Sequence, residues 1–279
     1  MQRVDRLRWV AQFSVRAYGV RIGIRSNDRA CLKRVCDHLP YGWEPHSSGS
    51  VDRLYSIRLG GKGPRPNLDQ FNELYGDHIR LARSVHVDQV FEAFESDLRL
   101  FVAELARRRV FVHAGVVGWS GKAIVLPGRS YSGKSSLVAE LVRAGATYYS
   151  DEYAVFDARG RVHPFPKPLE MRHQGNERQT KVDVEELGGA TGTRPLPVAL
   201  VLMTQFKQGA TWRPRKLSPG IGVLELLSNT VSARRSPEKA LTTLKQVVAT
   251  AQIMKGVRGE CRDIVKSILK RVESESSVR

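Results

Sequence analysis

The run Gly128-Arg-Ser-Tyr-Ser-Gly-Lys-Ser135 fits the phosphate-binding pattern G-x-x-x-x-G-K-[ST]. Glycines in this pattern let the backbone curl, so that successive N–H groups point at a polyphosphate. Lys134 would reach the β- and γ-phosphates, and Ser135 would offer its hydroxyl to Mg²⁺. The pattern therefore predicts binding of ATP with Mg²⁺, and the nucleotide-binding residues that we expect are Gly128, Ser130, Tyr131, Ser132, Gly133, Lys134, Ser135 and Ser136.

The segments on either side of this loop support the phosphate-binding interpretation of the pattern. Residues 123–126 form a short apolar run typical of a buried strand, and residues 136–143 have the pattern of a helix. A helix that begins at the loop adds a favourable partial positive charge for phosphate. The alternative, a glycine-rich turn that binds nothing, is therefore much less favoured.

Two adjacent acids follow one strand later. Gly145 is placed to end the helix, and residues 147–150 read as a strand that reaches Asp151 and Glu152. A loop with the pattern G-x-x-x-x-G-K-[ST] is called a P-loop. A carboxylate that binds the metal ion is expected at the end of the strand that follows the P-loop helix. We expect Ser135, Glu152 and Glu170 to hold Mg²⁺, which prefers oxygen ligands. The alternative is an exposed turn with solvated carboxylates.

The first region, residues 1–109, has the pattern of a small α+β unit. Residues 13–17 and 20–25 alternate at period two and predict a hairpin around Tyr18-Gly19, and residues 54–59 predict a further strand. Asn27 is expected to cap a short helix that ends near Pro40. Asp88 is expected to cap a long amphipathic helix near 88–108, whose apolar face is more typical of core than of a ligand surface.

The rest of the chain, residues 110–279, predicts an α/β domain built around the loop. Strands are expected at 110–117, 197–203 and 211–217, with a tight turn at 118–121 and an extended, proline-rich segment at 162–172. A polar stretch at 173–195 has no clear periodicity. Helices are expected at 219–229, 236–253 and 259–273, with Ser236 as the N-cap of the second.

Composition narrows the class of protein. The chain has 279 residues, of which 41% are hydrophobic, and no stretch approaches the ~20 apolar residues that span a bilayer. No apolar segment typical of a secretory signal follows Met1. The three cysteines and the histidines show no zinc spacing. We therefore expect a cytoplasmic protein with reduced thiols.

The charge balance is strongly basic. Lys and Arg number 45 against 28 Asp and Glu, which gives a net charge of +17. The densest basic runs, at 107–109 and 213–216, are short and are not interleaved with aromatic residues, so nucleic acid is not the favoured partner. The leading interpretation of the excess basic charge is that it lies on solvated faces of the protein. The next is that it binds an acidic protein or peptide partner.

The region from 113 to 172 also resembles a known family. A strand that contains His113, the P-loop, the acid pair and the segment Leu169-Glu-Met-Arg172 look like the catalytic domain of HPr kinase/phosphorylase and its serine-kinase relatives. The resemblance implies a P-loop kinase domain of the HPr kinase C-terminal type, a twisted mixed sheet with flanking helices. It also implies that Asp151 is the catalytic base, that His113 lies near the transferred phosphate, and that the protein self-associates.

The segment Leu169-Glu-Met-Arg172 supplies two further candidate site residues. Glu170 would join the metal ligands and Arg172 the catalytic groups, whereas the alternative for both is a surface ion pair. Two differences from the archetypal HPr kinase bear on the identity of the substrate. Glu152 stands where the archetype has Asp, and the residues after Arg172 lack the archetype's glycine-rich continuation, so we expect an acceptor other than HPr.

The sequence thus predicts an ATP-dependent kinase that transfers the γ-phosphoryl group to a serine-type hydroxyl. The acceptor is a peptide, a protein or a small molecule, and the net charge of +10 over residues 161–279 (21 basic and 11 acidic residues) favours an acidic one. Lys134 and the loop N–H groups would form the charge clamp that phosphoryl transfer needs. The alternatives are a P-loop ATPase and a nucleotide-sensing module without kinase activity.

Overall fold

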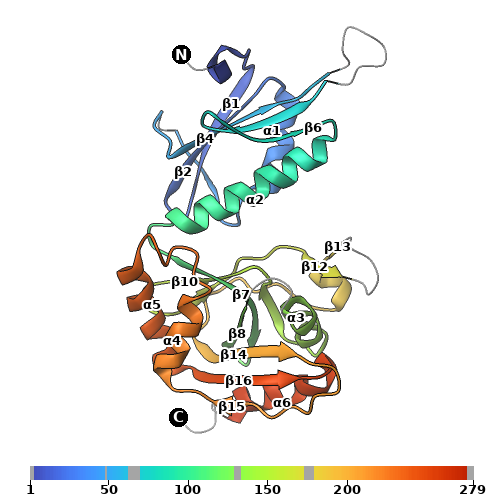
Figure 1. The fold of residues 1–279 in the computed structure, drawn as a ribbon, viewed down its shortest axis with the longest axis vertical. Helices are drawn as coiled ribbons and strands as arrows, with labels where there is room; N and C mark the ends of the chain where they lie inside the picture. Colours follow the sequence, from blue (N-terminus) through green and yellow to red (C-terminus); the bar gives the residue numbers. More distant parts are fainter. Residues whose placement is uncertain (1–2, 48, 62–69, 129–132, 173–178, 275–279) are drawn as a thin grey trace. The chain divides into compact units, whose positions relative to one another are not determined.

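The protein is a mixed α/β structure, seen in a computed structural model that describes residues 3–47, 49–61, 70–128, 133–172 and 179–274 (Figure 1). The chain divides into two compact units, a first unit of residues 1–108 and a second unit of residues 109–279. Within the described ranges, no helix is both long enough and apolar enough to cross a membrane.

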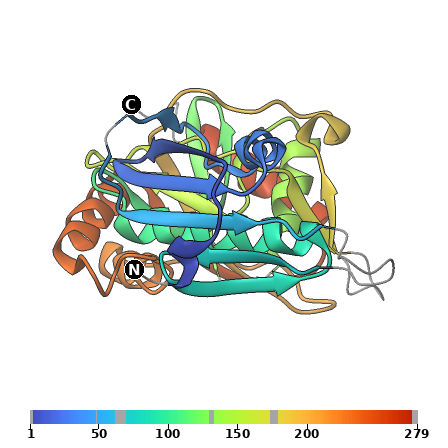
Figure 2. The same ribbon diagram turned by 90° about the horizontal axis from the view of Figure 1, so that it is seen from above.

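The first unit is built on a six-stranded sheet with the order β3-β1-β2-β4-β5-β6, whose strands lie side by side in Figure 2. The predicted hairpin is confirmed, because β1 and β2 pair antiparallel around Tyr18 and Gly19, whose φ angles of 51° and 85° fit a tight turn. The strands are β1 (Ala11–Ala17), β2 (Val20–Ser26), β3 (Glu44–Pro45), β4 (Arg53–Arg58), β5 (Asn72–Gly76) and β6 (Ile79–Ser84).

One long helix supplies much of the core of the first unit. In α2 (Val87–Leu105), the apolar side chains recur at helical spacing and are buried against the sheet, which confirms the predicted core face. Tyr55 and Phe94 meet edge to face there, with ring centroids 5.1 Å apart. The short helices of this unit are η1 (Arg3–Arg6), α1 (Arg29–Val35) and η2 (Cys36–His38).

Both predicted helix caps in this unit were wrong by one or two positions. Asp28, not Asn27, caps α1, because its carboxylate accepts hydrogen bonds from the backbone N–H groups of Ala30 and Cys31. Asn27 instead exchanges hydrogen bonds with the backbone of Leu59. His86 occupies the N-cap position of α2, and Asp88 lies in its first turn, where it forms an ion pair with Arg34.

The second unit contains an eight-stranded mixed sheet. Its order is β11-β10-β7-β8-β14-β16-β15, with β9 also paired to β7. β8, β14 and β16 are parallel neighbours, and the remaining pairs are antiparallel. The strands are β7 (Val110–Trp119), β8 (Lys122–Pro127), β9 (Thr147–Ser150), β10 (Tyr153–Phe156), β11 (Val162–His163), β14 (Val198–Phe206), β15 (Arg215–Lys216) and β16 (Gln252–Arg258).

Helices cover both faces of this sheet, so the second unit has three layers (Figure 1). α3 (Lys134–Arg143) and α6 (Cys261–Ser274) pack on one face, and α4 (Pro219–Leu227) and α5 (Pro237–Thr250) pack on the other. A separate hairpin of β12 (Leu169–Arg172) and β13 (Gln179–Val182) precedes the short helix η3 (Val184–Leu187).

Several predicted boundaries in this unit need correction. β7 extends through Gly118 and Trp119, so the turn is only Ser120-Gly121. The exposed strand predicted at 211–217 is reduced to β15. The helix predicted at 236–253 ends at Thr250, although Ser236 does occupy its N-cap position. The residues that follow form β16, a strand that the sequence pattern did not predict.

Candidate functional site

The acid pair lies where two strands share one edge of β7. β10 pairs with residues 110–113 of β7 and β9 pairs with residues 116–118, so Asp151 and Glu152 fall in the break between them. The backbone N–H of Ala114 donates to the carbonyl oxygen of Glu152 at 3.2 Å, and Ser150 accepts hydrogen bonds from the N–H groups of Glu152 and Tyr153. The carboxylates are therefore presented at a fixed point on the sheet.

The P-loop begins on the other edge of β7 at the same level. β8 ends at Pro127, opposite Ala114, and the N–H of Gly128 donates to the carbonyl oxygen of His113 at 3.2 Å. Two adjacent residues of β7 thus hold the first glycine of the loop and the acid pair. The predicted nucleotide-binding residues Ser130, Tyr131 and Ser132 lie outside the described residues.

The described end of the loop runs directly into α3. Gly133 is the N-cap residue and has φ 77° and ψ 23°, a left-handed conformation that favours glycine. Its carbonyl oxygen accepts the N–H of Leu137 at 3.3 Å. Lys134 and Ser135 follow in the first turn with half-buried side chains, and Ser136 is exposed. Residues 133–136 thus form the helix N-terminus, a position at which backbone N–H groups can bind an anion.

Asp151 is the most perturbed acid of the site. Burial raises the pKa of its carboxyl to about 6, and a hydrogen bond with Ser135 and the charge of Lys134 oppose this rise. Its Oδ1 atom is buried and has no hydrogen-bond partner among the described residues. An orphaned buried carboxylate oxygen is costly in a finished structure, so it indicates a place where a ligand group would bind.

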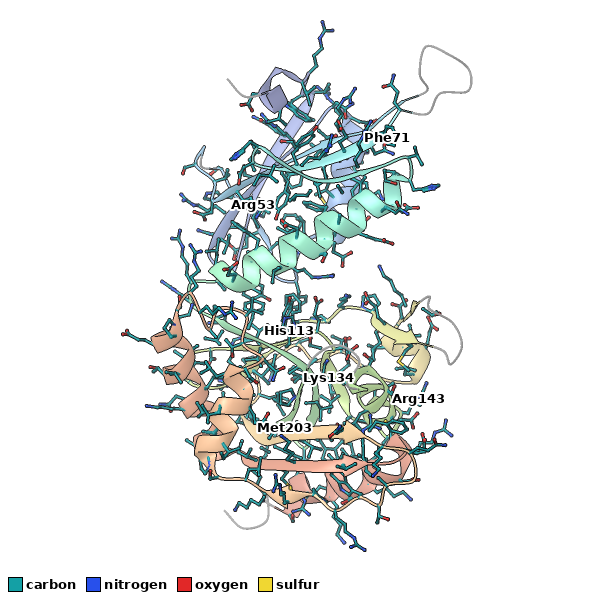
Figure 3. The ribbon with its side chains drawn as sticks, viewed as in Figure 1. Arg53, Phe71, His113, Lys134, Arg143 and Met203 are labelled. Carbon is teal, nitrogen blue, oxygen red and sulfur yellow. The ribbon has the colours of Figure 1, made fainter. Side chains whose placement is uncertain are left out.

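Lys134 and His113 share this electrostatic environment. Burial lowers the pKa of Lys134, and the negative charge of Asp151 opposes that shift. The ring of His113 is exposed on one side and packs obliquely on Tyr153, with ring centroids 4.8 Å apart. Its partial burial lowers its pKa, while Glu152 acts in the opposite direction. Figure 3 labels both side chains within the second unit.

Lys167 is a member of the site that the sequence interpretation missed. Its Nζ lies 3.4 Å from Oε2 of Glu152 and 2.8 Å from Oε1 of Glu170, so one ammonium joins the two carboxylates that were predicted to bind metal. The side chain of Lys167 is only 16% exposed. Its position between Pro166 and Pro168, in an extended segment leading to Leu169-Glu170, was the available signal.

Two arginines remain to be compared with the sequence prediction: Arg172 was predicted as a site residue, and Arg258 was not. The backbone of Arg172 pairs with Gln179 at the end of β12, and its side chain lies outside what the structure describes. Arg258, at the end of β16, was not predicted, and its guanidinium donates a hydrogen bond to the carbonyl oxygen of Gly133 at 2.9 Å. No sequence signal marked it, because the strand itself was missed.

The oxygen atoms of this site have the chemistry that Mg²⁺ prefers. Ser135, Glu152 and Glu170 supply one hydroxyl and two carboxylates. No group of three or more His, Cys, Asp or Glu in the described part of the chain is arranged to hold a metal ion. The hydroxyl and carboxylate oxygens are of the kind that bind Mg²⁺ together with other oxygen ligands.

Comparisons with known proteins give a distant structural similarity. No family model matches the chain, and no curated protein matches it. Among solved structures, the chain is similar to the Hpr(Ser) kinase/phosphatase from Coxiella burnetii, with a TM-score of 0.32 and 12% sequence identity over 60% of this chain and 96% of that chain.

Proposed function

We propose that the second unit is an ATP-dependent kinase that transfers the γ-phosphoryl group to a serine-type hydroxyl. The observation that carries this proposal is the position of Asp151. Its carboxylate is hydrogen-bonded to Ser135 at the start of α3 and lies close enough to Lys134 to perturb its pKa, yet Oδ1 has no partner among the described residues. A cation that would clamp phosphate and a carboxylate that would act as the base thus lie close together.

Each group then has a role that its position supports. The N–H groups at the start of α3 and the ammonium of Lys134 would bind the β- and γ-phosphates. Asp151 would accept the proton of the acceptor hydroxyl as its oxygen attacks the γ-phosphorus, and a pKa of about 6 suits a general base at neutral pH. ADP would leave with the electron pair of the broken P–O bond. His113 would lie beside the transferred phosphoryl group.

The carboxylates next to this base would serve a metal ion. Ser135, Glu152 and Glu170 would hold Mg²⁺, with the ion taking the place of Lys167 beside the two carboxylates, and Mg²⁺ would supply charge neutralisation on the β- and γ-phosphates. The role of Arg172 in catalysis is part of the proposal and rests on the sequence resemblance alone. The acceptor that we propose is a peptide, a protein or a small molecule with a free hydroxyl, and self-association is proposed on the same ground.

The test is incubation of the protein with γ-labelled ATP, Mg²⁺ and hydroxyl-bearing acceptors, together with nucleotide affinity by calorimetry. Lys134→Ala should lose most nucleotide affinity while the far-ultraviolet circular dichroism spectrum stays that of the wild type. The matched control is Lys122→Ala, at the opposite end of β8, which should bind as the wild type does.

The label distinguishes the possible functions. Transfer to an acceptor supports the kinase, whereas release of labelled phosphate without transfer to any acceptor supports a P-loop ATPase. Binding without either reaction supports a nucleotide-sensing module. Wild-type affinity in Lys134→Ala would place the nucleotide elsewhere and end the proposal.

A further inference from the structure

Arg258 is a buried cation beside the P-loop. It ends β16 and is 2% exposed. One terminal nitrogen donates to the carbonyl oxygen of Gly133 at 2.9 Å and the other to that of Gly259 at 3.1 Å. Phe206, its partner in the parallel pair of β14 and β16, places its ring centroid 5.6 Å from the guanidinium carbon.

The charge of Arg258 is not balanced within the described structure. No carboxylate of the described residues lies within ion-pair distance of its guanidinium, and its Nε is buried without a hydrogen-bond partner. A buried charge without a counter-ion costs several kcal/mol in general, and replacement by an apolar residue of similar size is often neutral or stabilising. The fold therefore carries a cost that ligand-free packing does not explain.

Arg258 contacts the start of the helix that follows the loop. Gly133 is the N-cap residue of α3, and the N-terminus of a helix carries a partial positive charge of its own. The ammonium of Lys134 follows one residue later. The buried guanidinium thus adjoins the positively polarised start of α3, an arrangement that a polyanion bound there would stabilise.

We propose that Arg258 is a positioning residue for polyphosphate binding: it fixes the Gly133 turn through the carbonyl oxygen, and bound phosphates balance its charge. The contact also explains why position 133 requires glycine, since a Cβ there would lie 2.4 Å from a terminal nitrogen of Arg258. This inference rests on the proposed nucleotide site but not on phosphoryl transfer.

The test measures affinity and ligand-free stability in the same variants. Calorimetry with MgATP and with inorganic tripolyphosphate would compare the wild type with Arg258→Met, Arg258→Lys and the control Arg262→Met. Arg262 lies four residues further on and pairs with Glu140, with its side chain 81% exposed. Urea unfolding without ligand would be recorded for each.

We expect Arg258→Met to bind both probes ~10- to 100-fold more weakly, the usual effect of losing a charge-assisted contact. Its ligand-free stability should equal or exceed that of the wild type, which a merely structural arginine would not allow. Arg258→Lys should recover part of the affinity, because it keeps the charge but cannot donate to two carbonyl groups in the same way. Arg262→Met should bind as the wild type does.

Each outcome separates this inference from the proposed function. Wild-type affinity in Arg258→Met, or an affinity in Arg258→Lys no better than in Arg258→Met, overturns the inference. If Arg258→Met does not fold, Arg258→Lys decides alone: weaker binding at unchanged stability supports the inference, and unchanged binding overturns it. A wild type that binds both probes but transfers no phosphate ends the kinase proposal and leaves the inference standing. A wild type that binds neither probe overturns both.

Discussion

Asp151 and Glu152 are adjacent in the chain, yet the fold gives their carboxylates different neighbours. Asp151 faces Ser135 and Lys134 at the start of α3, whereas Glu152 shares Lys167 with Glu170. The division arises because the backbone bends between β9 and β10, so successive side chains leave the sheet in different directions. Two acids of similar chemistry can therefore perform different tasks.

The paired variants Asp151→Asn and Glu152→Gln test this division of roles. Asp151→Asn removes basicity but keeps size, so MgATP affinity should stay close to that of the wild type while phosphoryl transfer falls ~10²- to 10⁴-fold. Glu152→Gln should weaken Mg²⁺-dependent binding and transfer together, since a metal ligand serves both steps. Calorimetry and single-turnover transfer measure the two effects. Loss of Mg²⁺-dependent binding in Asp151→Asn would make Asp151 a metal ligand and not the base.

At the scale of elements, the site depends on how closely α3 approaches β7. Gly115 makes this approach possible, because a Cβ at that position would lie 2.6 Å from Cγ2 of Val138, on the buried face of α3. The same Cβ would be 3.7 Å from Oδ1 of Asp151. One missing side chain thus sets the distance between the P-loop helix and the strand that holds the acid pair.

Gly115→Ala should therefore destabilise the protein by ~1–3 kcal/mol, the usual cost of overpacking a core. Val138→Ala should also destabilise it when made alone, but the double variant should cost less than the sum of the two, because each change makes room for the other. Gly220→Ala is the control, since a Cβ there meets only Ser218, at 4.0 Å. Urea unfolding measures all four variants. Strict additivity would show that the contact between β7 and α3 is not the limiting one.

The elements next to the loop could be predicted from sequence because local signals coincide there. The apolar run, the glycines and the apolar helix face within residues 123–143 all indicate a strand, a loop and a helix, and β8 and α3 confirm the predicted strand and helix. For β16, the local sequence signals did not coincide. Ala251 separates it from α5 without a glycine or proline, and Gln252, Lys255 and Gly256 interrupt its apolar pattern. Arg258 could not be foreseen without that strand.

Contacts between side chains could not be predicted from the sequence either, because they depend on how the segments fold together. The two prolines beside Lys167 mark an extended segment but not its partners, and only the fold shows that its ammonium contacts both Glu152 and Glu170. The helix caps show the same limit over a shorter range. Asn27 and Asp28 are equally good capping residues, and the side chain of Asn27 is occupied by the backbone of Leu59, the residue after β4.

At the scale of the whole molecule, 45 basic side chains stand against 28 acidic ones, and some of the basic side chains are paired with acids. Several arginines of the first unit's sheet are matched by acids: Arg16 with Glu44, Arg21 with Asp52, Arg25 with Asp5 and Arg58 with Glu73. Each of these arginines is thus paired with an acid of the first unit.

The pair of Arg21 and Asp52 predicts a pH dependence of stability. The guanidinium of Arg21 lowers the pKa of Asp52 to about 2, below its value in an unfolded chain. The pair therefore stabilises the folded state above about pH 4, and this contribution is lost as the pH falls toward 2. Asp52→Asn should cost ~1 kcal/mol at pH 6, after allowance for solvent screening, and less at pH 2.5.

Urea unfolding of the wild type and Asp52→Asn at both pH values measures this difference. Glu44→Gln is the matched control, because its pair with Arg16 is far more exposed, with the side chains of Arg16 and Glu44 49% and 66% accessible, and should contribute little at either pH. A difference between wild type and Asp52→Asn that stays constant from pH 6 to pH 2.5 would contradict the assignment.

The contact between Arg258 and Gly133 has a consequence for the order in which the chain is made. The phosphate-binding motif is complete at Ser135, but the guanidinium that holds its last turn comes from a residue 125 positions beyond Gly133. A nascent chain that has emerged from the ribosome only as far as α5 carries the entire motif without β16 or α6 beside it. Synthesis of the second unit must therefore be nearly complete before the contact between Arg258 and Gly133 can form.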